Sequence, residues 1–442
     1  MENNQLIVAI EIGSTKIVGA IAEKSASGYL SVNHLEEEKL TNCVRYGCVQ
    51  NVENTKSAIV RIVKKLENKI DGDITDVYVG INGRSLHSVP TEIDRNLNIA
   101  ESITKQNIEN LKNSAFKEPI TSYEPIDIVP QAYYVDNKEN PNPVGCCGSS
   151  ITIKFNRIVA KPTLKLNLER AMGALKVKKF LVTSLAMAES ILTEEERTLG
   201  CMLVDMGAET TTVTIYKNGA MSYMATLPMG GRNLTRDLVN GLQNTTEEKA
   251  EMVKKNIAEP LNIEAVDLPI DGISSKAAIN YIISRTSEII TNVNKQIEYA
   301  HLQPSDVKTI VLVGGAAKLK GLRAEFKEKT KIETRMGATP AAINILNHEI
   351  NKFEHIELFA LLDKAASIIA DGATCVRRHN YAPQEDGPTI THDDSSAKRM
   401  EDSHGKAEEK KPKKKSFFGR FKSTLENLMT EEDRLLSDDD EN

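Results

Sequence analysis

The fold is decided by the stretch AIEIGSTK at residues 9–16, which recurs in altered form as LVDMGAETT at residues 203–211. In both stretches a β-branched run ends in a carboxylate, a glycine follows two positions later, and hydroxyl residues come next. The two carboxylates, Glu11 and Asp205, are 194 residues apart (205 − 11). This repetition indicates an internal duplication, with two matching lobes that each offer a tight turn to a ligand between them.

The residue types in these turns suit phosphate groups. Gly13 and Gly207 are expected to adopt positive φ, which would let phosphate oxygens approach backbone N–H groups. Further donors follow the glycines, namely hydroxyl groups and one ammonium group for a β- or γ-phosphate. These donors are Ser14, Thr15, Lys16, Thr210 and Thr211.

The two carboxylates supply oxygens that only accept hydrogen bonds. Mg²⁺ prefers one or two carboxylates together with phosphate and water. We therefore expect Glu11 and Asp205 to hold a hydrated Mg²⁺ or to position a catalytic water molecule, with no metal bound by protein ligands alone.

A third stretch, IVLVGGAA at residues 310–317, ends another apolar run. Its residues Gly314, Gly315 and Ala316 would let a flat base or ribose lie on the backbone. Each motif alone could be an ordinary strand–turn–strand hairpin, because short glycine motifs are common. The three motifs in this order favour a nucleotide site, with ATP as the cofactor.

These segments resemble those of the actin-like ATPase superfamily, which includes actin, the heat-shock chaperone ATPases, the sugar kinases and bacterial filament proteins. Within it, residues 6–377 are similar to the FtsA family of bacterial cell-division proteins. The stretches that carry this resemblance are VGING (79–83), IVPQAY (128–133), NPVG (142–145), SILTEEER (190–197) and LPMGG (227–231). The resemblance implies an α/β, actin-like, two-lobed fold of duplicated ribonuclease-H-like domains with an inserted FtsA-type subdomain.

The domain organisation follows from the resemblance and from changes in composition along the chain. We expect a first lobe (1–83 and 161–197), an inserted subdomain (84–160), a second lobe (198–230 and 304–377), a helical cap subdomain (231–303), a disordered linker (378–410), an amphipathic helix (411–430) and an acidic tail (431–442).

Local patterns predict a hairpin over residues 6–23 and a series of helices. The predicted helices are 54–70, 105–117, 163–175, 234–242, 246–257, 274–299, 322–330 and 357–370. The last two are expected to close the second lobe.

The second phosphate turn departs from the family pattern, in which Asp-x-Gly-Gly-Gly-Thr is usual. Ala208 and Glu209 replace two glycines, and Glu209 adds negative charge near the γ-phosphate. This favours nucleotide binding with at most weak ATPase activity. By resemblance, Glu251 and Lys254 contact ribose and adenine, although the pair could also be an ordinary exposed i,i+3 ion pair.

The last segment combines a basic run with an apolar helical face. At 100° per residue, its aromatic and aliphatic side chains fall in one arc, which favours insertion into an anionic membrane surface. The residues expected to contact the membrane are Lys413, Lys414, Lys415, Phe417, Phe418, Arg420, Phe421, Lys422, Leu425 and Leu428. A solvated tail, or docking on the protein's own surface, is the alternative.

Composition is compatible with a cytosolic protein. The net charge of −6 gives no nucleic-acid footprint, the six cysteines show no metal or C-x-x-C spacing, and no apolar run reaches the roughly 18 residues of a spanning helix. No N-terminal signal peptide is visible.

The resemblance implies a peripheral protein on the cytoplasmic face of the inner membrane at the division site. There it would polymerise, tether the tubulin-like protein FtsZ and recruit later division proteins. The cap would receive the FtsZ C-terminal peptide, with Arg285 and Lys295 as basic contacts. Alternatives are another actin-like cytoskeletal or pilus-assembly ATPase, a chaperone ATPase, or a kinase of the superfamily.

Overall fold

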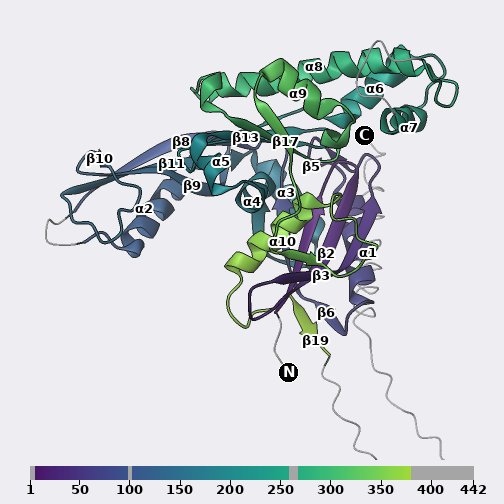
Figure 1. Ribbon diagram of the computed structural model, residues 1–442. Coiled ribbons are helices and arrows are strands. Elements are labelled where there is room, and N and C mark those ends of the chain that lie inside the picture. Colours follow the sequence, from purple (N-terminus) through teal and green to yellow (C-terminus); the bar gives the residue numbers. More distant parts are fainter. Residues whose placement is uncertain (1–4, 98–101, 258–266, 380–442) are drawn as a thin grey trace, which may run out of the picture. The chain divides into compact units, whose positions relative to one another are not determined.

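The computed structural model describes residues 5–97, 102–257 and 267–379, which form an α/β unit with two large sheets (Figure 1). The first sheet has the strand order β12–β7–β1–β2–β3–β18. Its strands are β1 (Gln5–Ile12), β2 (Lys16–Lys24), β3 (Leu30–Lys39), β7 (Asp76–Ile81), β12 (Lys176–Val182) and β18 (Ile343–Ile345). The expected hairpin is confirmed, because β1 pairs antiparallel with β2.

The second sheet repeats this order and then continues. Its order is β17–β16–β13–β14–β15–β8–β11–β9–β10. The strands are β17 (Glu333–Met336), β16 (Thr309–Val313), β13 (Cys201–Met206), β14 (Thr211–Lys217), β15 (Ala220–Leu227), β8 (His87–Asn96), β11 (Ser150–Ala160), β9 (Glu124–Val135) and β10 (Lys138–Glu139).

The duplication is visible in the pairing of the strands. In the first sheet, β1 pairs antiparallel with β2 and parallel with β7, which pairs parallel with β12. In the second, β13 pairs antiparallel with β14 and parallel with β16, which pairs parallel with β17. The two phosphate turns thus follow equivalent strands, as the repeated motif predicts.

Helices cover both sheets. Their bounds are α1 (Val52–Glu67), α2 (Lys105–Lys117), α3 (Pro162–Met172), α4 (Thr183–Ile191), α5 (Glu194–Leu199), α6 (Gly231–Gly241), α7 (Glu247–Asn256), α8 (Ser275–Tyr299), α9 (Leu322–Thr330) and α10 (Ile356–Ile368). Each of the eight predicted helices is present, with ends within a few residues of the expected ones. Short strands complete the fold: β4 (Val44–Arg45), β5 (Cys48–Val49), β6 (Gly72–Ile74) and β19 (Val376–Arg378).

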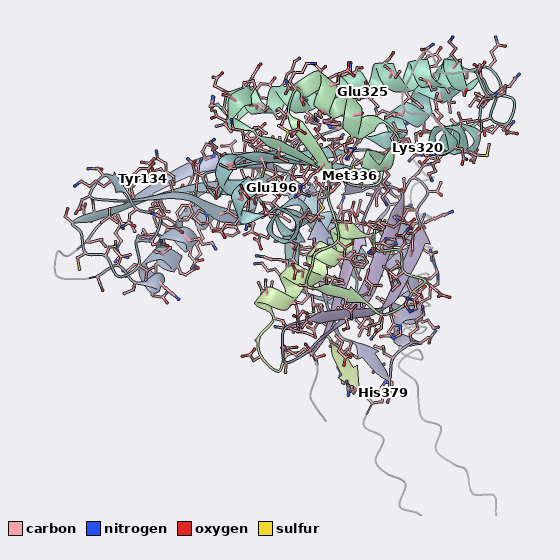
Figure 2. The ribbon with its side chains drawn as sticks, in the orientation of Figure 1. Tyr134, Glu196, Lys320, Glu325, Met336 and His379 are labelled. Atoms are coloured by element: carbon pink, nitrogen blue, oxygen red, sulfur yellow. The ribbon has the colours of Figure 1, made fainter. Side chains whose placement is uncertain are left out.

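Sequence features set several of these helix ends. Thr246, where the predicted helix 246–257 begins, caps α7 by accepting a hydrogen bond from the Lys249 amide. In α1 the residues spaced for one face, including Ile59, Ile62 and Leu66, are fully buried. Figure 2 labels Glu196 of α5. This carboxylate accepts two hydrogen bonds from Arg335 of β17, at 2.6 and 2.7 Å, and so fixes α5 to the sheet.

The position of α10 differs from the expectation. We expected residues 357–370 to close the second lobe, but α10 packs on β1, β7 and α4 of the first lobe. Gly80 of β7 makes this possible, because a Cβ atom there would lie 2.7 Å from the Leu361 side chain. The chain therefore returns to the first lobe after β17. There β18 pairs with β3, and β19 pairs with β6.

The inserted subdomain consists of β8, α2, β9, β10 and β11. It has its own apolar cluster around Ile151, Ile153 and Phe155. The chain enters it after Gly83, as expected, but its strands extend the second sheet through the pair Ala225–His87. The Asn156 amide also donates to the Met221 carbonyl at 2.8 Å. The insertion thus spans from the first lobe to the edge of the second sheet.

Three expected segments lie mostly or wholly outside the described residues. The linker was expected over residues 378–410, but Arg378 belongs to β19 and pairs with Gly72 of β6. From residue 380 on, the linker, the amphipathic helix and the acidic tail lie outside the described residues. Among residues 5–97, 102–257 and 267–379, no helix combines the length and apolar character needed to cross a bilayer.

Candidate functional site

The two phosphate turns have the same backbone geometry. The Gly13 amide donates to the Lys16 carbonyl at 2.9 Å, and the Gly207 amide donates to the Thr210 carbonyl at 2.8 Å. Neither glycine has positive φ, so the conformational reason expected from the sequence is wrong. A Cβ atom would lie 3.2 Å from the Lys16 carbonyl at Gly13 and 3.3 Å from the Thr210 carbonyl at Gly207, so a side chain at either position would be tightly packed.

A cavity opens where the two turns meet. Residues of both lobes line it: Glu11, Ile12, Gly13, Ser14, Gly47, Asn82, Thr183, Asp205, Gly207, Ala208, Thr210 and Glu357. Most of them follow the carboxyl ends of β1, β7, β12 and β13, and the carboxyl ends of parallel strands are where α/β sheets bind ligands.

Three carboxylates share this cavity. Burial, with Glu357 and Asp205 nearby, raises the pKa of Glu11 to about 8. Burial and Glu357 likewise raise the pKa of Asp205 to about 8, and burial raises the pKa of Glu357. The cluster therefore suits a ligand that brings positive charge, and its oxygens match the chemistry of a hydrated Mg²⁺. Among the described residues, no group of three or more His, Cys, Asp or Glu is arranged to bind a metal ion by protein ligands alone, so an ion in this cavity would keep water ligands.

The other residues of the first turn have different surroundings. Ser14 lines the cavity, and its hydroxyl accepts a hydrogen bond from the Gly47 amide at 3.1 Å. Lys16 is paired with Glu37 at 2.6 Å, so a phosphate would have to compete for its ammonium group. Thr15 is exposed and is not among the residues that line the cavity.

In the second turn the two threonines separate. Thr210 lines the cavity. Thr211 is fully buried, and its hydroxyl donates to the Met229 carbonyl at 2.8 Å. Thr211 therefore supports the turn from behind, and its hydroxyl has a protein partner.

The two glycines after β16 play different parts. Gly314 has φ +94°, and a Cβ atom there would lie 2.4 Å from the Met206 carbonyl and 2.6 Å from the Asp205 carboxylate. Gly315 has φ −63°, and a Cβ atom there would meet no atom within 4 Å. Gly314 is thus required by the protein itself, whereas Gly315 leaves open space.

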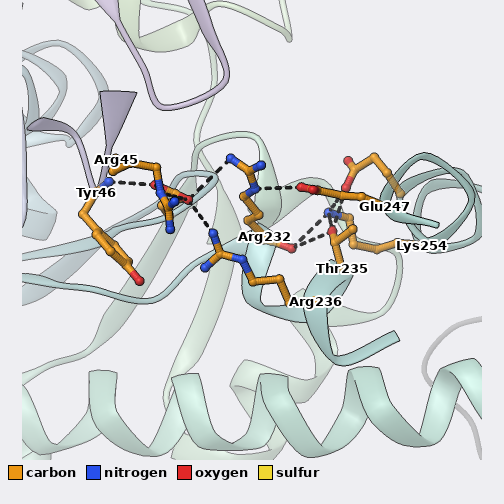
Figure 3. A network of polar contacts seen from close by, with 10 residues as sticks. Arg45, Tyr46, Arg232, Thr235, Arg236, Glu247 and Lys254 are labelled. Atoms are coloured by element: carbon orange, nitrogen blue, oxygen red, sulfur yellow. Dashed lines mark hydrogen bonds and ion pairs between the residues drawn. The ribbon is translucent and has the colours of Figure 1, made fainter. Parts of the chain in front are cut away.

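Glu251 and Lys254 form a part-buried group with Thr235. The Lys254 ammonium donates to Glu251 at 2.5 Å, to the Thr235 hydroxyl at 2.9 Å and to the Gly231 carbonyl at 3.0 Å (Figure 3). Burial alone would raise the pKa of Glu251, but the Lys254 charge and the Thr235 hydroxyl hold that pKa below its ordinary value. Only 13% of the Lys254 side chain is exposed, so this is no ordinary surface ion pair.

The third motif, residues 310–317, lies next to the group formed by Glu251, Lys254 and Thr235. A Cβ atom on Gly231 would lie 3.0 Å from Ala316 and 3.7 Å from the Lys254 ammonium. Ala316 and the Glu251–Lys254 pair, which are far apart in the sequence, therefore lie together near the start of α6.

Glu209 does not leave a free charge beside the phosphate turns. Its side chain is 1% exposed and accepts hydrogen bonds from the Tyr46 amide at 2.7 Å and the Arg236 guanidinium at 3.0 Å (Figure 3). Arg45 lies 3.0 Å and Arg232 3.5 Å from the same carboxylate.

Outside the repeated motifs, sequence reasoning missed four residues that line the cavity, namely Gly47, Asn82, Thr183 and Glu357. A signal existed for Asn82 and Thr183, which directly follow parallel strands that end in buried residues. Gly47 and Glu357 had no such signal, because a hairpin and a helix start bring them to the cavity.

The cap subdomain carries a second, open groove. It is lined by Asp237, Asn240, Gly241, Tyr281, Ser284, Arg285 and Glu288. Arg285 donates to Asp237 at 2.6 and 2.9 Å and to Glu288 at 2.5 Å. Lys295 is exposed ten residues further along α8, about 15 Å away at the helical rise. The structure does not bring these two basic residues together.

Comparisons with known proteins identify relatives. A family model described as cell division protein FtsA matches residues 202–353, and a model of the SHS2 domain inserted in FtsA matches residues 83–159. The cell division protein FtsA of Porphyromonas gingivalis is 30% identical over 393 residues, 84% of this chain and 80% of the relative. That of Escherichia coli K12 is 26% identical over 358 residues, 76% of this chain and 84% of the relative.

Among solved structures, the PilM–PilN type IV pilus biogenesis complex is similar, with a TM-score of 0.60 at 14% identity. The match covers 81% of this chain and 98% of that chain, and at this identity it concerns the fold alone. The expected fold class and the inserted subdomain are confirmed.

Proposed function

Because the chain belongs to the FtsA family of cell-division proteins, we propose that it binds ATP with Mg²⁺ between its two lobes and acts as a membrane tether for FtsZ. One observation carries the nucleotide part of this proposal. The cavity at the carboxyl ends of the strands is lined by both phosphate turns and by carboxylates of both lobes.

Each part of the site suits one part of the nucleotide. The Gly13–Ser14 and Gly207–Thr210 turns would bind phosphates, and Glu251 and Lys254 the ribose. The base would lie over Gly315, where the protein leaves open space, and beside Ala316. Glu11 and Asp205 would hold hydrated Mg²⁺, which supplies positive charge to the phosphates and relieves the repulsion among the carboxylates. ATP hydrolysis is at most weak.

Nucleotide would act as a closing ligand. A ligand that contacts both lobes has a higher affinity for the closed arrangement and shifts the population toward it. We propose that this arrangement is the one that polymerises. We propose that the inserted subdomain, which the SHS2 family model matches, contacts neighbouring copies and later division proteins.

The tethering part rests on two surfaces. The groove beside Arg285 on the cap offers both charge signs and an aromatic side chain to a peptide, which suits the FtsZ C-terminal peptide. The segment 411–430 places basic and aromatic residues together for an anionic lipid surface. The protein would then act at the cytoplasmic face of the inner membrane, at the division site.

Co-sedimentation with anionic vesicles tests the proposal. FtsZ should pellet with the vesicles only when the full-length chain is present. Asp205→Asn should weaken Mg-ATP binding measured by titration calorimetry. A full-length chain that pellets but leaves FtsZ in solution would contradict the tether, and a chain that binds no Mg-ATP would contradict the nucleotide site.

A further inference from the structure

A buried carboxylate joins the two lobes beside the cavity. Glu209 lies in the turn between β13 and β14 of the second lobe, and its side chain is 1% exposed. Two of its donors, the Tyr46 amide and the Arg45 guanidinium, come from the β4–β5 hairpin of the first lobe. Arg236 of α6, in the second lobe, is a third donor, and Arg232 of the same helix forms an ion pair with the carboxylate at 3.5 Å.

The β4–β5 hairpin also touches the first phosphate turn. Tyr46 and Gly47 are consecutive residues with positive φ, of 51° and 72°. The Tyr46 amide points to Glu209 at 2.7 Å, while the Gly47 amide points to the Ser14 hydroxyl at 3.1 Å. One short hairpin therefore connects the first phosphate turn to the second.

The second turn is equally well fixed on its other side. The Gly207 and Ala208 carbonyls accept hydrogen bonds from the Gly231 and Arg232 amides, at 3.0 and 2.6 Å. A Cβ atom on Gly230 would lie 2.6 Å from the Gly207 carbonyl, so the turn and the start of α6 are in close contact. Because Glu209 is fixed to the second lobe and Tyr46 belongs to the first, a change in the distance between them reports a movement of one lobe relative to the other.

We infer that Glu209 is a positioning residue that clasps the lobes together and raises the apparent affinity for nucleotide. Every donor and acceptor of this clasp belongs to the chain, so its contribution to closure does not require a γ-phosphate. Charged hydrogen bonds in a buried place are stronger than neutral ones. The inference rests on the proposed function in one respect, namely that nucleotide favours the closed arrangement.

A purely electrostatic role for Glu209 makes the opposite prediction. If its carboxylate only repelled phosphates, Glu209→Gln would bind ATP more tightly. If it clasps the lobes, the variant has a smaller closed population, and its apparent ATP affinity falls by about tenfold. The sign of the change therefore separates the two roles.

The experiment combines amide exchange with ATP titration on the full-length chain. In Glu209→Gln, the Tyr46 amide should exchange with deuterium about tenfold faster than in the wild type without nucleotide, and saturating Mg-ATP should restore its protection. Arg45→Gln, which leaves Glu209 with its second-lobe partners, should change exchange and affinity in the same direction. Arg45→Gln thus tests the same contact independently if Glu209→Gln fails to fold.

Glu247→Gln is the matched control. Glu247 accepts from Arg232 at 2.8 Å but is half exposed and lies on α7 of the same lobe, so this variant should leave Tyr46 exchange and ATP affinity unchanged. Unchanged Tyr46 exchange in both Glu209→Gln and Arg45→Gln, or tighter ATP binding in Glu209→Gln, would overturn the clasp. A wild type that binds no ATP would instead overturn the proposed function, while the exchange comparison still decides the clasp.

Discussion

At the residue scale, two neighbouring glycines follow β16, and they differ in whether the protein itself or a bound ligand requires a residue without a side chain. Gly314 has positive φ and closely approaches the Met206 carbonyl and the Asp205 carboxylate. Gly315 has a helical φ that any residue adopts, and it faces open space. A side chain at 314 would therefore disturb the protein, whereas one at 315 would disturb whatever binds beside it.

Gly315→Val should keep the thermal stability of the wild type and bind ATP at least tenfold more weakly. Gly314→Val should lose both ATP binding and stability, by about 1–3 kcal/mol from backbone strain alone. Thermal unfolding and calorimetric ATP titration of the pair measure both effects. If Gly315→Val bound ATP normally, the base would have to lie elsewhere.

A second residue-scale feature is the buried His355 at the start of α10. Burial, followed by the charge of Lys16, lowers its pKa from 6.5 to about 4, although Glu37 and Glu354 act in the opposite direction. Its ring also packs edge-on against Phe359, with centroids 6.4 Å apart. The folded protein therefore keeps this imidazole neutral at a pH where the unfolded chain would already bind a proton.

The free energy of unfolding should fall as pH drops from about 6.5 to about 4, because protons bind the unfolded state first. The pKa difference is 6.5 − 4 = 2.5, so this one group accounts for about 3 kcal/mol at 1.36 kcal/mol per pKa unit. His355→Gln should remove that part of the pH dependence in denaturant titrations, while the exposed His348→Gln should not. Equal acid sensitivity in wild type and His355→Gln would contradict the assignment.

At the scale of elements, α6 and α8 form the groove of the cap subdomain. Arg285 of α8 bridges to Asp237 of α6. Under the proposed function, an acidic group of the FtsZ peptide would replace Asp237 as the partner of Arg285. Lys295 lies on the same helix, outside the groove. The helix therefore provides a test residue and a matched control with the same charge.

Arg285→Ala should weaken binding of the FtsZ C-terminal peptide by about tenfold or more, because arginines in central pockets dominate such interfaces. Lys295→Ala should change the affinity by less than about threefold, as rim charges usually do. Fluorescence anisotropy with a labelled peptide measures both. A larger effect of Lys295→Ala would place the peptide on a different face of α8.

At the scale of the whole molecule, the proposed function assigns separate tasks to two parts of the chain. The structure describes a folded unit up to residue 379, and the basic, aromatic segment 411–430 follows later in the sequence. Under the proposal, lipid binding through that segment would hold the nucleotide and partner sites near a membrane.

Phe421→Glu should reduce pelleting with anionic vesicles more than Lys414→Gln does, since burying one aromatic side chain is worth roughly 1.5–3 kcal/mol against about 1 kcal/mol for one lysine. At about 1 M salt only the lysine contribution should disappear. Phe353→Glu, which changes an exposed phenylalanine of the folded unit, is the control and should pellet like the wild type. Equal binding to neutral and anionic vesicles would show that the tail does not recognise lipid charge.

The sequence by itself determined the features that depend on neighbours along the chain. Three features follow from local spacing: the repeated strand–turn motif, the place of the insertion after Gly83 and the helix start at Thr246. They can be predicted because strand periodicity, glycine sterics and helix capping act over a few residues. The expected positive φ at Gly13 and Gly207 was wrong; at each glycine, a Cβ atom would make a tight contact with the carbonyl three residues later.

Only the tertiary structure decided which lobe α10 joins and what surrounds the two acidic residues of the second turn. Helix α10 is apolar around most of its surface, so its sequence does not indicate which face packs against which lobe. Gly80 of β7 permits a close approach of Leu361, and this contact places α10 on the first lobe. Asp205 meets Glu357 across 152 residues (357 − 205). Glu209 meets Tyr46 across 163. Such contacts depend on how the two sheets close on each other, which no local pattern encodes.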